Sequence, residues 1–153
     1  MTSAGALCQW NTARSIPWRL SASSAPTAAP CGAAGALEAL RRHGIERAVF
    51  HWHKAPAEVT RAIVDAGYLV SVGPEVVYRE RDRALVYDTD LESLLVESDG
   101  PWPYRGEFDG MPSGPWLVSR VAEEVAKIKR LPVDDVMFQL SANACRLFDL
   151  MWA

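Results

Sequence analysis

Two carboxylates stand directly after a short apolar run, where acidic side chains are costly unless they meet a partner. Leu94-Leu95-Val96 is typical of a buried strand, and Glu97 and Asp99 follow it before Gly100-Pro101 ends the strand. Because side chains alternate along an extended strand, residues 97 and 99 are expected to share a face, roughly 7 Å apart. A metal ion, an arginine or a helix N-terminus would each satisfy such a pair, and these residues alone leave all three open.

A histidine stands at the end of a second apolar stretch. His51 lies near the C-terminal end of the segment Arg47–Trp52, and imidazole is a ligand that zinc and other divalent cations favour. His53 completes a His-x-His pair, and two side chains on one face of an extended strand could clamp a metal. A lone histidine in such a place is more often an ordinary hydrogen-bonded residue, so the histidines by themselves indicate no metal.

The elements that must position these residues are three strand and helix units followed by two closing helices. The apolar spacing predicts strands over 47–52, 68–72 and 91–96, and helices over 37–43, 56–66, 117–128 and onward from 132. The charged stretch over 76–86 is expected to form a solvent-exposed helix. Strands that alternate with helices predict an α/β fold with a parallel sheet, and ligands bind at the carboxyl edge of such sheets. We therefore expect His51 and Asp99 to converge at one edge.

Four stretches, taken in order, resemble one protein family. They are Phe50–Pro56 (FHWHKAP), Ala66–Val76 (AGYLVSVGPEV), Leu94–Trp102 (LLVESDGPW) and Asn143–Phe148 (NACRLF). Together they resemble the TatD-like metal-dependent hydrolases of the amidohydrolase superfamily, from about Ala36 to Leu150. Such a protein is a TIM (β/α)₈ barrel, which needs about 250 residues. The resemblance therefore implies a partial barrel: the last three βα units and the C-terminal helices.

The resemblance also implies a function, namely metal-dependent hydrolysis of ester bonds, with the phosphodiesters of DNA as the expected substrate. His51 and Asp99 match positions that bind the divalent metal ion (Zn, Mn or Mg) in the family. Asp99 would also orient or deprotonate the attacking water, as the catalytic residue. Glu97 would support these ligands or the fold. His53 matches a position that is more often aromatic in the family, which places it in the loop or behind the ligands.

The loop over residues 101–115 is dense in Gly and Pro and is expected to wall the site. Its candidate substrate contacts are Trp102 and Arg105. An indole ring could stack on a base or a sugar, or it could pack the loop onto the barrel, and the sequence leaves both open.

The family's remaining metal-binding strands have no counterpart before Ala36. Two ligands fall short of the three that catalytic zinc usually has, so two alternatives accompany the hydrolase: a truncated, catalytically inactive remnant and a non-catalytic binding module. Three open βα units would also expose sheet edges and invite self-association.

Composition sets the remaining expectations. The first acidic residue is Glu38, and this shift predicts a poorly ordered or unrelated tail over residues 1–35, before a family-like part over 36–153. The net charge of −3 provides no general polyanion-binding surface, so a metal would have to attract DNA. Three scattered cysteines without a CxxC pair suggest the reducing cytoplasm as the compartment. The sequence contains no run of 18 apolar residues, so it predicts no membrane-spanning helix.

Overall fold

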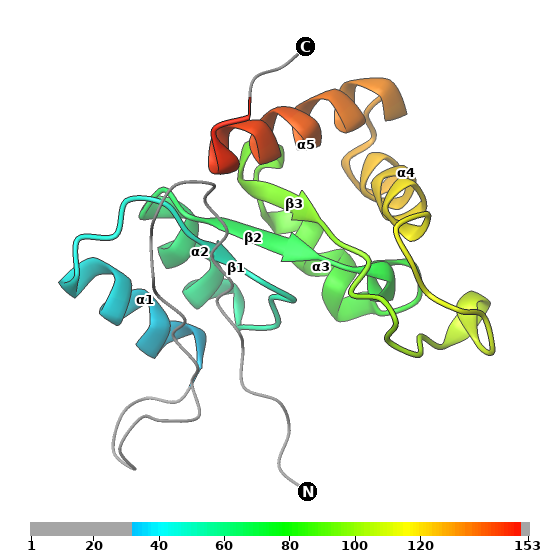
Figure 1. Ribbon diagram of the computed structural model, residues 1–153, viewed down its shortest axis with the longest axis horizontal. Coiled ribbons are helices and arrows are strands. Elements are labelled where there is room, and N and C mark those ends of the chain that lie inside the picture. Colours follow the sequence, from blue (N-terminus) through cyan, green and yellow to red (C-terminus); the bar gives the residue numbers. More distant parts are fainter. Residues whose placement is uncertain (1–31, 151–153) are drawn as a thin grey trace, which may run out of the picture.

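A three-stranded parallel sheet organises the computed structural model, which describes residues 32–150 of the chain (Figure 1). The strands are β1 (Val49–Phe50), β2 (Leu69–Val72) and β3 (Leu94–Val96), in the order β1-β2-β3. The helices are α1 (Ala33–Arg42), α2 (Ala57–Asp65), α3 (Glu80–Asp88), α4 (Leu117–Lys129) and α5 (Val133–Phe148), with 3-10 turns at Pro74–Val77, Leu91–Ser93 and Gly106–Phe108. This is the predicted α/β arrangement.

The parallel register places all three strand ends at one edge of the sheet. Val49 pairs with Leu69 on β2, and farther along β2 Val72 pairs with Val96 on β3. The residues that follow Phe50, Val72 and Val96 therefore leave the sheet at its carboxyl edge, where ligands bind in parallel α/β folds.

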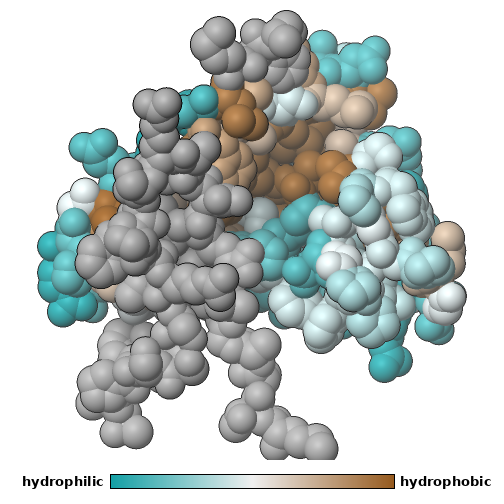
Figure 2. Space-filling view, in the orientation of Figure 1, coloured by the Kyte–Doolittle hydropathy of each residue, from teal (hydrophilic) through white to brown (hydrophobic). Residues whose placement is uncertain are grey.

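Period-2 alternation along the strands divides the apolar residues between two faces. Val70, Val72 and Leu94 face the main core, where α2, α3 and α4 pack with Ile63, Val86, Val121 and Val125. Leu69 and Leu95 face the other way and pack with Leu147 of α5. Figure 2 shows apolar surface gathered over β3 and the side of α5 that faces it.

Helix α5 is anchored to the start of β3 by a buried amide. The Asn143 Nδ2 group donates to the carbonyls of Leu91 at 2.7 Å and Leu94 at 2.8 Å, and Asn143 is fully buried. A buried amide with both donor hydrogens bonded fixes the helix at a defined position, since any slip would leave those groups unpaired.

Two predicted strands are too long, and the predicted tail lies mostly outside the described residues. The strand predicted over 91–96 is shorter, because residues 91–93 form a 3-10 turn and β3 begins at Leu94. The strand predicted over 47–52 is too long, because β1 ends at Phe50 and the chain then turns, with Trp52 at φ 48°. The tail predicted over 1–35 lies outside the described residues up to position 31, and α1 already begins at Ala33. No helix within residues 32–150 has the length and apolar character needed to cross a membrane.

Candidate functional site

His51 and Asp99 meet at the carboxyl edge of the sheet, although they follow its two outer strands. The His51 Nε2 atom lies 3.5 Å from Asp99 Oδ1 and 3.1 Å from Glu97 Oε2. The side chains of His51 and Asp99 are 28% and 29% exposed, whereas that of Glu97 is 11% exposed. The predicted convergence is therefore confirmed, with Glu97 at the base of the group and the other two side chains open to solvent.

Left-handed backbone positions turn the chain on both sides of this group. Trp52 has φ 48° and Asp99 has φ 44°, a conformation that costs a non-glycine residue roughly 1–2 kcal/mol. Asp99 lies beyond β3, and its left-handed backbone conformation, rather than strand alternation, accompanies the approach of both carboxylates to His51. A strained backbone conformation persists only where surrounding contacts stabilise it, and such conformations are most frequent at functional sites.

Ser71 on the central strand links the two outer strand ends. Its hydroxyl donates to Glu97 Oε2 at 2.5 Å, and its Oγ accepts the backbone N–H of Trp52 at 3.1 Å. The Ser71 carbonyl also accepts the N–H of His53 at 3.1 Å. One buried residue therefore positions the turn that carries His51 and the carboxylate that His51 contacts.

The Glu97 carboxyl group lies in an environment that disfavours its charge. Burial raises its pKa, and the nearby Asp99 carboxylate adds to that, whereas the Ser71 hydrogen bond and His51 lower it; the net direction is upward. Its Oε1 atom is buried without a hydrogen-bond partner among the described residues. A buried carboxylate oxygen without a partner is one that a bound cation would satisfy.

Tyr104, from the loop after β3, backs the acidic segment. It is 2% exposed, and its hydroxyl donates to the Ser98 carbonyl at 2.9 Å. Burial, then the carboxylates of Asp99 and Glu97, raise its pKa, so the phenol stays protonated.

Glu75 is a site residue that the sequence analysis missed. It follows β2, is 5% exposed, and its Oε2 accepts from Trp52 Nε1 at 2.9 Å and from Lys54 Nζ at 2.8 Å. Burial alone would raise its pKa, but the Lys54 and Trp52 hydrogen bonds and the charge of Arg79 outweigh burial and lower it. The same signal that exposed Glu97, an acid just after an apolar strand and beside Gly-Pro, could have identified it.

His53 does not form a metal clamp with His51, which corrects the pairing that their spacing allowed. The turn at Trp52 directs His53 inward, where it is 4% exposed and its Nε2 lies 2.8 Å from Thr60 Oγ1. Burial, then the charge of Lys54, lower its pKa to about 4. His53 therefore links the segment after β1 to helix α2 through Thr60.

The two predicted loop contacts differ in their surroundings. Trp102 is 45% exposed, and its ring lies 5.1 Å from the ring of Trp52. Arg105 is exposed, and its backbone N–H donates to the Tyr78 hydroxyl at 3.4 Å. Among the described residues, no ion pair or hydrogen bond engages its guanidinium group.

The donor types at this edge fit a divalent cation, but the set of ligands is small. Imidazole and carboxylate are donors that zinc and manganese accept, and His51 and Asp99 supply one of each. Within residues 32–150, no three His, Cys, Asp or Glu side chains are arranged to hold a metal ion. The described part of the chain therefore offers two candidate donors and, behind them, the unpartnered oxygen of Glu97.

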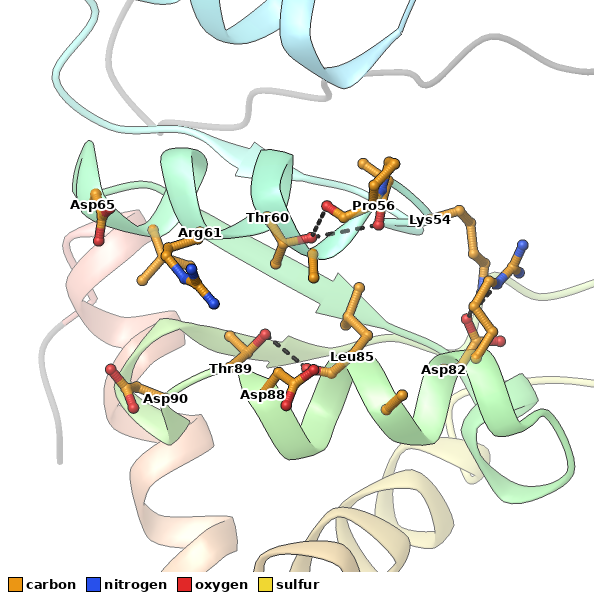
Figure 3. A pocket seen from close by; sticks show the side chains of 15 residues that line it. Lys54, Pro56, Thr60, Arg61, Asp65, Asp82, Leu85, Asp88, Thr89 and Asp90 are labelled. Carbon is orange, nitrogen blue, oxygen red and sulfur yellow. Dashed lines mark hydrogen bonds and ion pairs between the residues drawn. The ribbon is translucent and has the colours of Figure 1, made fainter.

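A separate groove lies between α2 and α3, on the helix layer. Its volume is about 570 Å³, and its lining includes Arg61, Asp65, Asp88 and Asp90 (Figure 3). At one end Lys54 reaches Asp82, with 2.9 Å between Nζ and Oδ1. The groove has charges of both signs but no histidine, and His51, Glu97 and Asp99 are not among its lining residues. We assign the candidate chemistry to the strand edge.

Comparisons with known proteins bear on this edge. A family model for TatD-related DNases matches residues 32–149. An uncharacterized metal-dependent hydrolase of Haemophilus influenzae is 29% identical over 115 residues, 75% of this chain and 45% of that protein. The human deoxyribonuclease TATDN3 is 29% identical over 112 residues, covering 73% and 40%. The crystal structure of YjjV, a TatD homologue from Escherichia coli, matches with a TM-score of 0.68 and 27% identity, over 75% of this chain and 46% of that one.

Proposed function

This chain belongs to the TatD-related DNase family, and from that premise we propose that its His51–Asp99 edge is part of a metal-dependent site that hydrolyses the phosphodiester bonds of DNA. Its three βα units form part of a TIM barrel, and the chain spans less than half the length of the curated relatives named above. The observation that carries the proposal is the approach of His51 Nε2 to Asp99 Oδ1, 3.5 Å apart at the carboxyl edge of the sheet. A relative named as a deoxyribonuclease supports the choice of DNA.

His51 and Asp99 would hold the cation, which we propose to be zinc, manganese or magnesium. When bound, a divalent cation lowers the pKa of a water molecule and stabilises negative charge on a phosphoryl oxygen. His51 would present Nε2, the atom that already faces both carboxylates. Glu97 would support His51 and Asp99 from the buried side of the site. Ser71 binds one of its carboxylate oxygens, and the other oxygen has no partner among the described residues.

Asp99 is our proposed catalytic residue. Its side chain is 29% exposed, so water reaches it, and its backbone turn directs it toward His51. A carboxylate in this place can orient a water molecule for attack on phosphorus and accept its proton. Tyr104 would keep Asp99 in place by holding the preceding Ser98 carbonyl.

The ligand count leads us to propose that this 153-residue chain alone is at best a very weak hydrolase. Catalytic zinc usually has three protein ligands and a water, and residues 32–150 supply two at this edge. The alternatives are a non-catalytic remnant and a binding module without chemistry, which the same measurements separate.

The test is a nuclease assay on the purified chain, supplemented with manganese or zinc, beside a count of metal ions bound per chain. Asp99→Asn keeps the shape of the side chain and removes its charge, and the exposed Asp109→Asn serves as the matched control. Metal binding and slow cleavage that only Asp99→Asn abolishes would support the proposal. A chain that binds no metal and cleaves nothing would instead support the non-catalytic alternatives.

We further propose the cytoplasm as the compartment and self-association as the first interaction to test. Cys145 is a free thiol, and scattered thiols suit a reducing compartment.

β1 and β3 form the two edges of the described sheet, and open edges favour pairing between copies. Sedimentation of the chain at several concentrations would detect such pairing.

A further inference from the structure

Two indole rings border the His51–Asp99 edge. Trp52 directly follows His51, and Trp102 donates its backbone N–H to the carbonyl of Asp99 at 3.0 Å. Their ring centroids are 5.1 Å apart, with the ring planes at 65°. Each ring is thus tied through the chain to one of the two proposed metal ligands, and an edge-to-face pair leaves ring surface free.

Packing against Trp52 covers only part of the Trp102 side chain. The aromatic residues that anchor this loop are Tyr104 and Phe108. They are 2% and 4% exposed, and their ring centroids lie 6.5 Å apart. Trp102, in contrast, leaves 45% of its surface in solvent. A large aromatic side chain left open beside a candidate site indicates a contact surface for a ligand.

The pair is held in place before any ligand arrives. Trp52 donates Nε1–H to Glu75 at 2.9 Å, and the Lys54 ammonium group lies 5.7 Å from its ring centroid. The Trp102 carbonyl accepts a hydrogen bond from Ser113 Oγ at 2.6 Å. These bonds fix the backbone of Trp102, and the Trp52 ring contacts its indole ring. A ligand that stacks there therefore meets a residue that is already partly ordered.

The charge around the pair points to a neutral contact. Glu75, Glu97 and Asp99 make this edge acidic, and the nearby Lys54 is paired with Glu75 and Asp82. Lys54 therefore adds little attraction for a phosphate backbone here. Stacking on an aromatic ring contributes affinity without charge, and every nucleobase has a π-face to offer.

We propose that Trp102, backed by Trp52, is a stacking site for an unpaired nucleobase of single-stranded DNA, beside the phosphodiester bond at the His51–Asp99 edge. The assignment rests on the proposed function for its substrate class. It requires a single strand, or a frayed end, because a base within a duplex presents no free face to the indole ring. It predicts little preference among the four bases.

The test measures binding rather than cleavage. Fluorescence anisotropy of a labelled single-stranded oligonucleotide is followed as the full chain is added, without metal and with manganese. Trp102→Ala should weaken binding by about tenfold, the effect expected for the loss of one base stack, and Trp102→Phe should retain most of the affinity. Trp116→Ala is the matched control, because Trp116 lies just after the same loop and is 48% exposed, and it should bind like the wild type.

An abasic oligonucleotide of the same length provides the second arm. The wild-type chain should bind it about tenfold more weakly than the base-containing strand, whereas Trp102→Ala should bind both equally. Equal affinity of wild type and Trp102→Ala, or no binding of any oligonucleotide by the wild type, would overturn the stacking site. A chain that shows the Trp102 effect but never cleaves would refute the proposed hydrolysis and leave the stacking site standing.

Discussion

The hydroxyl of Ser71 donates a hydrogen bond to Glu97, with 2.5 Å between Oγ and Oε2. The same Oγ accepts the backbone N–H of Trp52 at 3.1 Å. The central strand therefore holds the ends of both neighbouring strands, the one that leads to His51 and the one that leads to Asp99. This link explains how two residues separated by a whole strand come within 3.5 Å of each other.

Replacing Ser71 with alanine should destabilise the chain by about 1–3 kcal/mol, because the Trp52 N–H and the buried Glu97 carboxyl group each lose a partner. The midpoint of urea unfolding measures this change. Ser119→Ala is the control, since Ser119 is exposed, and its cost should stay within about 0.5 kcal/mol. Equal midpoints for the two variants would show that the Ser71 link carries no stability.

Replacing His51 with alanine should lower the affinity of the chain for manganese by at least about tenfold, because one of the two proposed ligands is lost. Even the mutation of a residue that only hydrogen-bonds a metal ligand commonly lowers metal affinity by about tenfold. Isothermal titration with manganese measures the affinity. His43→Ala removes an exposed histidine elsewhere on the chain and should leave the affinity unchanged. An unaltered affinity in His51→Ala would exclude His51 as a ligand.

Replacing Glu124 with glutamine should cost about 2 kcal/mol at pH 7, since charge-assisted hydrogen bonds to a buried carboxylate are lost. Burial alone would raise the pKa of Glu124, but hydrogen bonds from Arg83 and Lys127 outweigh it and lower the pKa below 4.5. The unfolded chain then binds more protons, so this stability is present above pH 4.5 and is lost as the pH falls through the folded-state pKa.

Urea unfolding of the wild type and Glu124→Gln at a series of pH values measures this difference. The gap between the two proteins should shrink as the pH drops below 4.5. Glu123→Gln changes the neighbouring carboxylate, which is 52% exposed, and should show a small gap at every pH. A Glu124 gap that stayed constant down to pH 3 would contradict the assignment.

Replacing Gly106 with alanine should destabilise the chain more than replacing Gly110. Both have positive φ, 65° and 75°, so alanine costs roughly 1–2 kcal/mol of backbone strain at either position. A Cβ at Gly106 would also lie 3.0 Å from the Tyr78 ring, whereas one at Gly110 meets nothing within 4 Å. The extra crowding should add about 1–3 kcal/mol, measured as the difference between the unfolding midpoints of the two variants.

Local patterns were enough to predict the elements. The apolar runs before His51 and Glu97 predicted strands because alternation and β-branched residues are properties of short segments. Pro56 and Pro132 marked the starts of α2 and α5, because proline suits the first turn of a helix and no later position. The approach of His51 and Asp99 also followed, since parallel strands end at one edge.

The sequence by itself thus determined the kinds of residues at the strand ends and their order, which depend on neighbours in the chain. It also determined the edge on which they meet, because strands that alternate with helices pair in parallel. Only the tertiary structure decided where each side chain points beyond the strands. The left-handed turns at Trp52 and Asp99 redirect the chain after alternation has stopped, so His53 turns inward to Thr60 while His51 faces Glu97. Contacts between distant segments hold these turns, and no periodicity within one segment encodes them.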